Sequence, residues 1–285
     1  MFLQCAPALL IKHATMELYK HSLPFVRLTV LKRPSAIIKS PYVADVVTDD
    51  GRTGLCHTPG LGCCGLVENG RIIYGTASSD SAKTDWTAQV AECSDSEGIY
   101  YVGIHPMVSQ AVAHGLLDRV WAGASWKSEV VVEEGTRLDY VGTVPCAAGA
   151  DTVPAGAGTK KVYVEVKTAM ISVECDKPRT ERRAVFPEGF RKKKTDTVSP
   201  RAVKHAELLG NLCSQHGVAG SVLVYMVPRS DCGGGLELNA LDPTYCAAVR
   251  SAMCKGMIVR AFAVDYTLDG RVCLAGEVPF YWPAP

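Results

Sequence analysis

The pattern of apolar and polar positions changes character near residue 98. Before that point, short apolar segments such as 25–31, 42–47 and 71–74 are separated by Asp-Gly and Asn-Gly turns. Closely spaced strands joined by such turns are typical of a small β-barrel or meander. The pattern therefore predicts an N-terminal β-barrel over residues 1–98, with a short basic extension, and a barrel of the oligonucleotide-binding type fits it.

After residue 98, helix-like and strand-like patterns alternate. Apolar residues at helical spacing predict a helix over 106–117, and Ser199-Pro200 and Asp242-Pro243 are typical starts of two further helices. This alternation predicts an α/β (α+β) domain around a mixed sheet over residues 99–285. The expected strands are 126–133, 136–141, 162–167, 221–227, 257–266 and 272–276.

The strand expected at 162–167 carries charge within an apolar run. Side chains alternate along a strand, so Glu165 and Lys167 point to the same face. Buried charges are costly unless something uses them. Asp139 interrupts the apolar run at 136–141, and antiparallel pairing of the two strands would place it near Glu165. Two carboxylates and a lysine are the minimum set for phosphodiester hydrolysis with Mg²⁺ or Mn²⁺.

Less specific interpretations of these residues stay open. A Glu-x-Lys pair on a strand is most often an exposed salt bridge. Glu129 is a third candidate acid, and it fits equally well as a surface residue beside Lys127. Lys204 and His205 lie either over the site or on an exposed helix face. The sequence has no nucleophile elbow and no phosphate loop, so nothing favours those two chemistries.

Composition and charge place these residues in an ordinary globular chain. The 285 residues are 47% hydrophobic and carry a net charge of +1. Residues 160–205 are different, because thirteen Lys and Arg stand against six Asp and Glu, a local net charge of +7. A basic run beside a carboxylate site favours a phosphate-backbone ligand, although a solvated loop is the alternative. The candidate nucleic-acid contacts in this run are Arg182, Arg183, Arg191, Lys192, Lys193 and Lys194.

Cysteine usage and hydropathy indicate an intracellular protein. The twelve cysteines form no Cys-x-x-Cys pair, which is typical of buried thiols in a reducing compartment. No apolar segment is long enough for a membrane helix. The cytoplasm is favoured, with an organelle or the nucleus as alternatives, because the acid-poor first 44 residues also fit a transit peptide. Folded structure is expected from about Leu23.

Several segments resemble the sugar fermentation stimulation protein A family in order and spacing over roughly residues 99–276. They include Arg-Leu-Asp-Tyr-Val (137–141), Tyr-Val-Glu-Val-Lys-Thr (163–168) and Arg-Ala-Val-Lys-His-Ala-Glu-Leu (201–208). The resemblance implies an oligonucleotide-binding barrel joined to a PD-(D/E)XK nuclease-like domain, in a DNA-binding protein linked to the regulation of sugar metabolism genes. It also implies that Asp139, Glu165 and Lys167 are the core site residues, with Glu129 at the upstream acid.

Together these features predict a DNA nuclease that uses Mg²⁺ or Mn²⁺. Asp139, Glu165 and the Val166 carbonyl are expected to hold the metal, Lys167 and Glu129 to assist the chemistry, and Lys204 and His205 to contact phosphate. Two alternatives stay open: a DNA-binding regulator with a vestigial nuclease site, and an enzyme acting on a sugar phosphate. The expected partner is nucleic acid, with DNA favoured, without a membrane; a homodimer is an open alternative.

Overall fold

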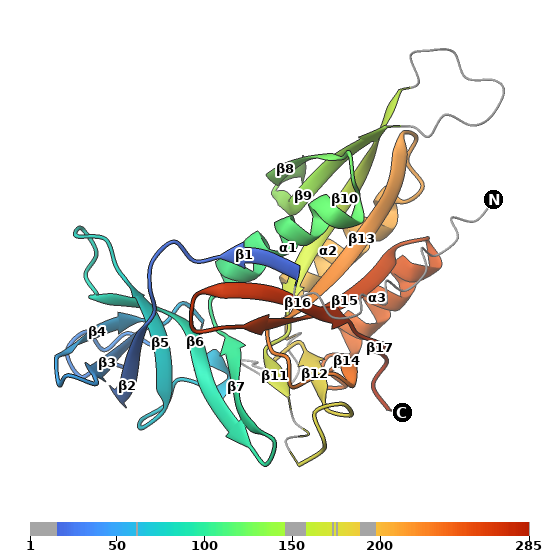
Figure 1. The fold of residues 1–285 in the computed structure, drawn as a ribbon. Coiled ribbons are helices and arrows are strands. Elements are labelled where there is room, and N and C mark those ends of the chain that lie inside the picture. Colours follow the sequence, from blue (N-terminus) through green and yellow to red (C-terminus); the bar gives the residue numbers. More distant parts are fainter. Residues whose placement is uncertain are drawn as a thin grey trace.

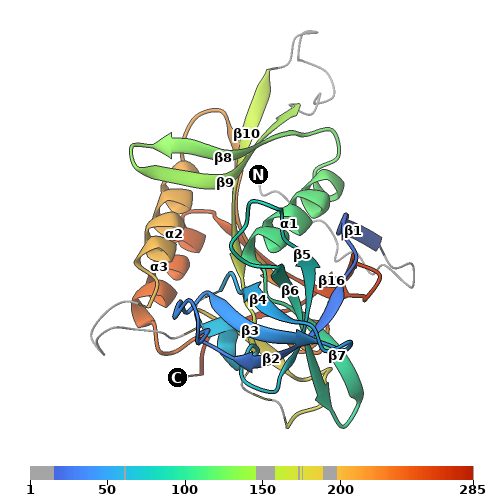
Figure 2. The ribbon, with the colours of Figure 1, turned by 90° about the vertical axis from the view of Figure 1, so that its left-hand side faces the viewer.

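The computed structural model describes residues 16–60, 62–145, 158–172, 174, 176–188 and 198–284. These residues form a small barrel, a large mixed sheet flanked by helices, and a small third sheet (Figure 1). The barrel lies to one side of the mixed sheet (Figure 1), and Figure 2 views the molecule from the barrel side. No helix in the described ranges is long and apolar enough to cross a bilayer.

The barrel closes through a pairing between two of its strands. Its sheet has the order β4-β3-β2-β5-β6-β7, and β4 also pairs with β6, so five strands form a ring. Leu28, Val46, Ile73 and Trp86 fill the interior. Gly51 takes a φ of 85° in the turn between β3 and β4, which a side chain would strain. The elements are β2 (Val26–Lys32), β3 (Val43–Thr48), β4 (Thr53–His57), the 3-10 helix η1 (Gly62–Gly65), β5 (Ile72–Ala77), β6 (Trp86–Asp95) and β7 (Gly98–Gly103).

The large sheet has seven strands in the order β1-β16-β15-β13-β10-β9-β8. Its central strands β10, β13 and β15 run parallel, and the flanking strands pair antiparallel. The predicted fold class, a small β-barrel followed by a mixed-sheet α/β domain, is confirmed. The strands are β1 (Met16–Lys20), β8 (Ser125–Glu133), β9 (Thr136–Pro145), β10 (Thr159–Thr168), β13 (Val218–Val227), β15 (Ile258–Tyr266) and β16 (Arg271–Glu277).

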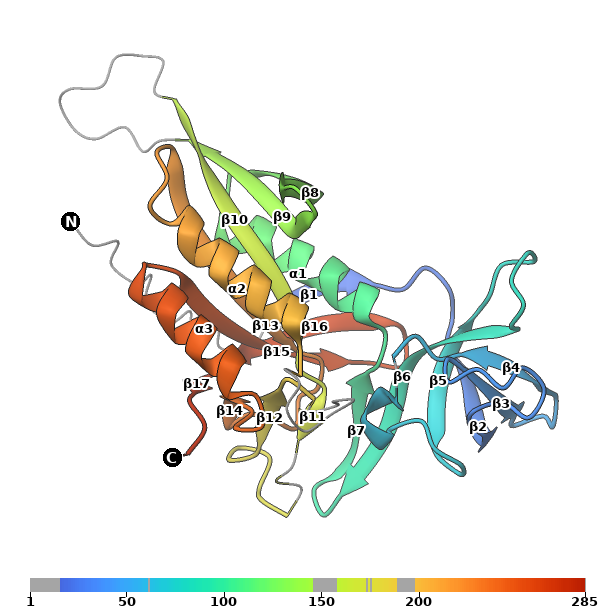
Figure 3. The same cartoon turned by 180° about the vertical axis from the view of Figure 1, so that it is seen from behind.

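Helices cover both faces of this sheet. Helix α1 (Pro106–Val120) packs on one face, where Val164 of β10 belongs to its hydrophobic cluster (Figure 1). Helices α2 (Pro200–Leu212) and α3 (Pro243–Cys254) pack on the other face, with Tyr163 of β10 in their cluster (Figure 3). Alternation along β10 therefore directs Glu165 and Lys167 toward α2.

Two parts of the fold differ from the sequence-based expectation. Strand β1 starts at Met16, before the expected start near Leu23, because it adds to the edge of the large sheet beside β16. A third sheet, of order β11-β12-β14-β17, was also missed, since strands this short carry no recognisable period. Its strands are β11 (Ile171–Ser172), β12 (Arg183–Phe186), β14 (Gly235–Leu238) and β17 (Phe280–Tyr281).

Candidate functional site

Asp139 lies where β9 and β10 part. The antiparallel ladder between the two strands ends at the pair Tyr140–Val164. Beyond it, the Val166 backbone N–H donates to Asp139 Oδ2 at 2.7 Å. On the other side, Gln110 Nε2 of α1 donates to Asp139 Oδ1 at 2.8 Å. Backbone and helix thus hold a carboxylate that is only 6% exposed.

Glu165 is buried one residue before Val166 and is 2% exposed. Lys167 Nζ and His205 Nδ1 both contact its Oε1 atom, and these two nitrogens are 3.4 Å apart. The second oxygen, Oε2, is buried and has no hydrogen-bond partner in the part of the chain that the structure describes. An unpaired buried carboxylate oxygen is costly, so Oε2 is a free acceptor for a ligand.

The pKa values of the two acids are shifted in opposite directions. Burial raises the pKa of Asp139 to about 6, the charge of Glu165 adds to this rise, and the Val166 N–H and Lys167 oppose it. Burial also acts to raise the pKa of Glu165, but the hydrogen bond with His205 and the charge of Lys167 hold it below its usual value. The site therefore holds two buried carboxylates, with Lys167 and His205 both placed on Glu165 and neither bonded to Asp139.

This donor set fits a hard divalent cation. Mg²⁺, Mn²⁺ and Ca²⁺ prefer oxygen ligands, and Mg²⁺ is usually bound by one or two carboxylates while it keeps several waters. Glu165 Oε2 is unpartnered, and Asp139 keeps lone pairs beyond its two hydrogen bonds. Within the described ranges, no group of three or more His, Cys, Asp and Glu is arranged to hold a metal, so the protein would supply few side-chain ligands.

Glu129 stands beside this pair on strand β8. Ser128 pairs with Tyr140 and Val130 with Leu138, so Glu129 lies opposite Asp139. Its charge contributes to the raised pKa of Asp139. Its φ is 54°, a left-handed conformation that is uncommon for a non-glycine residue and concentrates at functional sites. Its side chain is 47% exposed and lies 3.4 Å from Arg137, so it borders the buried pair without joining it.

The basic residues of the run do not share one environment. Lys204 is exposed on α2, whereas His205 is buried against Glu165. Arg182 is 2% exposed and pairs with Asp95 and Asp231. The structure thus places Arg182 in the interior rather than on a surface that binds phosphate.

Arg183 is also engaged, since it pairs with Glu237 at 2.8 Å and lies 3.8 Å from the centre of the Tyr281 ring. The sequence-based candidates Arg191, Lys192, Lys193 and Lys194 lie outside the described residues.

Gln110 is the contact that sequence reasoning missed. It lies on an amphipathic helix 29 residues before Asp139, and an amide at such a position carries no signal of its own. The sequence left open whether His205 lies over the site or on an exposed helix face. It lies over the site, because it is buried against Glu165.

Comparison with known proteins gives one family. The family described as "Sugar fermentation stimulation protein RE domain" matches residues 105–270, more than half of the chain. Relatives named "Sugar fermentation stimulation protein homolog" include one from Halorhodospira halophila, 29% identical over 242 residues that cover 80% of this chain and 86% of that protein. Another, from Rhodospirillum rubrum, is 28% identical over 222 residues that cover 76% of this chain and 83% of that protein.

A solved structure shows the same fold. It is "The structure of Pyrococcus Furiosus SfsA in complex with Ca2+", with a TM-score of 0.67 over 93% of this chain and 99% of that one. Its sequence is 20% identical to this chain, so the likeness concerns the fold alone.

Proposed function

The chain belongs to the sugar fermentation stimulation protein family, and we propose that it binds DNA and hydrolyses phosphodiester bonds with Mg²⁺ or Mn²⁺. Asp139 and Glu165 would hold the cation, with the Val166 carbonyl between them. One observation carries the proposal. Asp139 is held by the N–H next to Glu165, the charge of Glu165 acts on it, and Glu165 Oε2 has no partner among the described residues. A divalent cation there would balance the charge of Asp139, whose hydrogen bonds come only from a neutral amide and a backbone N–H.

Each residue around the pair has a separate role in this proposal. When bound, the metal would activate water and stabilise charge on the phosphate oxygens. The Lys167 side chain is 13% exposed. Its Nζ would orient the attacking water and offset the developing negative charge. Gln110 and the Val166 N–H fix the rotamer of Asp139. Glu129 would assist from the exposed rim, and Lys204 would contact the flanking phosphate.

The choice of metal draws on chemistry and on one relative. The Pyrococcus furiosus protein was solved with Ca²⁺, and we extend divalent-cation binding to this chain. An all-oxygen pair suits Mg²⁺, Mn²⁺ and Ca²⁺ better than Zn²⁺ or Cu²⁺, which favour nitrogen and sulfur ligands. A cytoplasmic location and a homodimer stay predictions.

One observation favours a second candidate, a DNA-binding protein that does not cut. Lys167 and His205 both contact Glu165 Oε1, and such a lock compensates one carboxylate without a metal. In that case the site would stabilise the fold, and DNA binding would need neither a divalent cation nor Lys167.

A cleavage assay separates the two candidates. The protein is incubated with supercoiled plasmid and with single-stranded DNA in Mg²⁺, Mn²⁺, Ca²⁺ or EDTA. We expect cleavage with Mg²⁺ or Mn²⁺, none with EDTA, and a loss of at least about a hundredfold in Asp139→Asn, the range typical for removal of a group that stabilises the transition state.

The matched control is Asp118→Asn, which changes an acid of α1 whose side chain is 54% exposed and should leave the rate unchanged. If folded protein binds the DNA but leaves it intact with every metal, the non-cleaving candidate is established.

A further inference from the structure

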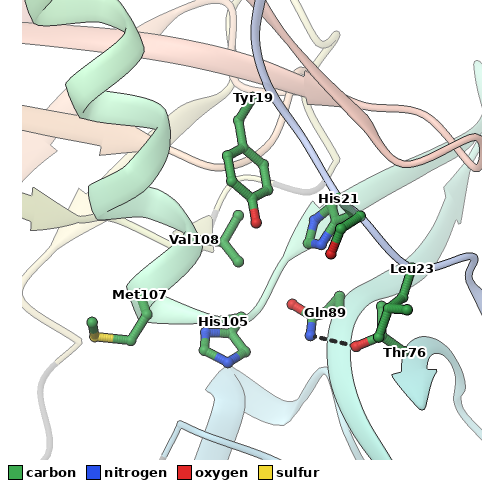
Figure 4. Close-up of a pocket in the computed structure, with 9 residues that line it drawn as sticks. Tyr19, His21, Leu23, Thr76, Gln89, His105, Met107 and Val108 are labelled. Atoms are coloured by element: carbon green, nitrogen blue, oxygen red, sulfur yellow. Dashed lines mark hydrogen bonds between the residues drawn. The ribbon is translucent and has the colours of Figure 1, made fainter. Parts of the chain in front are cut away.

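A cavity of about 300 Å³ lies where the barrel meets the mixed-sheet domain. Its walls come from β1 and the segment after it, from barrel strands β5 and β6, and from the start of α1 (Figure 4). This volume is at the lower end of the range for small-molecule sites, about 300–1,000 Å³. It has room for one small ring system.

Three polar atoms around this cavity lack hydrogen-bond partners within the described ranges. They are His21 Nε2, Gln89 Oε1 and His105 Nδ1, and all three are buried. The His21 residue is 8% exposed and Gln89 is 7% exposed. Figure 4 shows the side chains of His21, Gln89 and His105 around the same space. Folded proteins seldom leave buried polar atoms unpaired, so three of them at one cavity indicate a ligand that completes their hydrogen bonds.

These groups are held in place before any ligand binds. Gln89 Nε2 donates to Thr76 Oγ1 at 3.0 Å, which leaves Oε1 as the free end of the amide. The His21 backbone N–H donates to the Gly270 carbonyl at 2.8 Å. The His21 ring also packs edge-on against Tyr19 and Phe25, with centroid distances of 5.0 and 4.8 Å. The cavity therefore has fixed donor and acceptor positions, which favours a specific ligand.

The lining selects against charged ligands. Among the residues that the structure describes, no Lys, Arg, Asp or Glu lines the cavity. Burial lowers the pKa of His21 to about 4, and burial followed by the charge of His57 lowers the pKa of His105. Both rings are thus neutral at pH 7, so the cavity offers no cation to a phosphate or carboxylate. It offers apolar walls such as Tyr19 and Met107, with acceptors and donors between them.

We infer that this cavity binds a nucleobase that has been unstacked from a nucleic-acid strand. A base is flat, uncharged and bordered by donors and acceptors, and proteins read such bases by stacking and by hydrogen bonds to their edges. The inference rests on the proposed nucleic-acid function.

Position along α1 links the cavity to the carboxylate pair. Met107 lines the cavity, and Gln110, which holds Asp139, follows three residues later. That separation is about 5 Å along a helix axis. The cavity therefore lies within about one turn of α1 from the residue that holds Asp139.

Nucleoside binding without DNA or metal tests the inference. The full chain, labelled with ¹⁵N-histidine and kept in EDTA, is titrated with adenosine, guanosine, cytidine, uridine and thymidine. We expect at least one nucleoside to shift the ring-nitrogen signals of His21 and His105. Inorganic phosphate and free ribose should leave those signals in place. Binding of phosphate instead of nucleosides would overturn the inference.

Two variants connect the signal to the cavity. Gln89→Met removes the free acceptor at similar side-chain length and should weaken nucleoside affinity about tenfold, as for the loss of one buried hydrogen bond. Leu23 lies at the rim of the cavity and is 48% exposed, so Leu23→Trp leaves the core intact. The larger side chain fills the rim and should also weaken nucleoside binding. The control Gln215→Met, at an exposed position, should bind as the wild type does. Thermal unfolding verifies the fold of each variant.

The outcomes keep the two proposals apart. If DNA is not cut but nucleosides bind at His21 and His105, the cavity stands and only the nuclease proposal fails. If DNA is cut but no nucleoside binds, or if both cavity variants bind as the wild type does, the inference about the cavity is wrong.

Discussion

Two clusters of buried charge in this chain differ in how their carboxylates are balanced. Asp139 and Glu165 share one lysine, and burial raises the pKa of Asp139 to about 6. The other cluster, which we call the arginine cluster, joins Asp95 and Asp231 to three arginines. Its members are Asp95, Arg179, Arg182, Arg229 and Asp231.

The arginine cluster is fully compensated. Arg229 forms two hydrogen bonds of 2.7 Å to Asp231, and Arg182 bridges Asp231 and Asp95 at 2.6 and 2.9 Å. Burial acts to raise the pKa of Asp231, but the bond to Arg229 and the charges of both arginines hold it below its usual value. Asp95 belongs to barrel strand β6, so this cluster fastens the barrel to the mixed-sheet domain. The comparison separates buried acids that stabilise the fold from buried acids that are left available for a cation.

The largest effect is expected from the arginine cluster. Asp231→Asn leaves the buried Arg229 guanidinium without its carboxylate and leaves Arg182 with Asp95 alone. Breaking a buried ion pair typically costs about 3–5 kcal/mol. We expect the free energy of unfolding, measured with urea, to fall by about that amount. In the control Asp269→Asn, which removes an exposed partner of Arg271, the change should stay within about 1 kcal/mol. An equal fall in the free energy of unfolding in the two variants would contradict a stabilising role for the arginine cluster.

Opposite pH dependences should distinguish the two clusters in EDTA. The pKa of Asp139 is raised from 3.8 to about 6 in the folded protein, so the folded state binds more protons than the unfolded state between these values. Asp139 therefore lowers stability as pH rises from about 4 to 6, by about 3 kcal/mol at most. Asp231 has a lowered pKa, so its contribution is present above pH 4 and is lost as pH falls further.

Asp139→Asn isolates the first of these contributions. This variant should be more stable than the wild type at pH 7 and should lose the extra slope between pH 4 and 6 in urea titrations. An Asp139→Asn variant with the wild-type slope would show that Asp139 titrates normally.

Lys167→Met removes a positive charge that acts on the buried carboxylates Asp139 and Glu165. The change removes the cation on Glu165 Oε1, so affinity for Mn²⁺ should rise about tenfold, the equivalent of one pKa unit, while DNA cleavage falls. Calorimetric titration with Mn²⁺ measures the affinity, and Lys127→Met serves as a control on the same sheet. A lower affinity in Lys167→Met would mean that Lys167 does not compete with the cation.

The smallest effect concerns the surface beside the site. Lys204 is exposed on α2, and one phosphate contact contributes about one unit to the slope of log affinity against log salt. Lys204→Ala should reduce that slope by about one unit for DNA of any sequence. An unchanged slope, measured by fluorescence anisotropy at several salt concentrations, would remove Lys204 from the interface.

Local patterns predicted the framework of the fold well. Helical spacing and Ser-Pro or Asp-Pro starts marked α1, α2 and α3, and the Asp242 side chain does accept from Tyr245 N at 3.0 Å. The convergence of Asp139 with Glu165 followed from pairing the strand before the 145–160 segment with the strand after it. These features are local or depend on a single pairing, so the sequence contains them.

Long-range partners could not be predicted in the same way. Arg182 belongs to a basic run and looked exposed, yet its partners Asp95 and Asp231 are 87 and 49 residues away. Gln110 and the polar groups of the cavity come from separate elements that only the folded chain brings together. Burial of a polar side chain is decided by its distant partners, which no local pattern reports.

The central claim is that a divalent cation binds between Asp139 and Glu165. A crystal of the protein soaked in Mn²⁺ tests it most directly through anomalous diffraction. We predict a peak in contact with an Asp139 oxygen and with Glu165 Oε2. No peak at full soaking concentration, with Glu165 still held by Lys167 and His205, would contradict the claim.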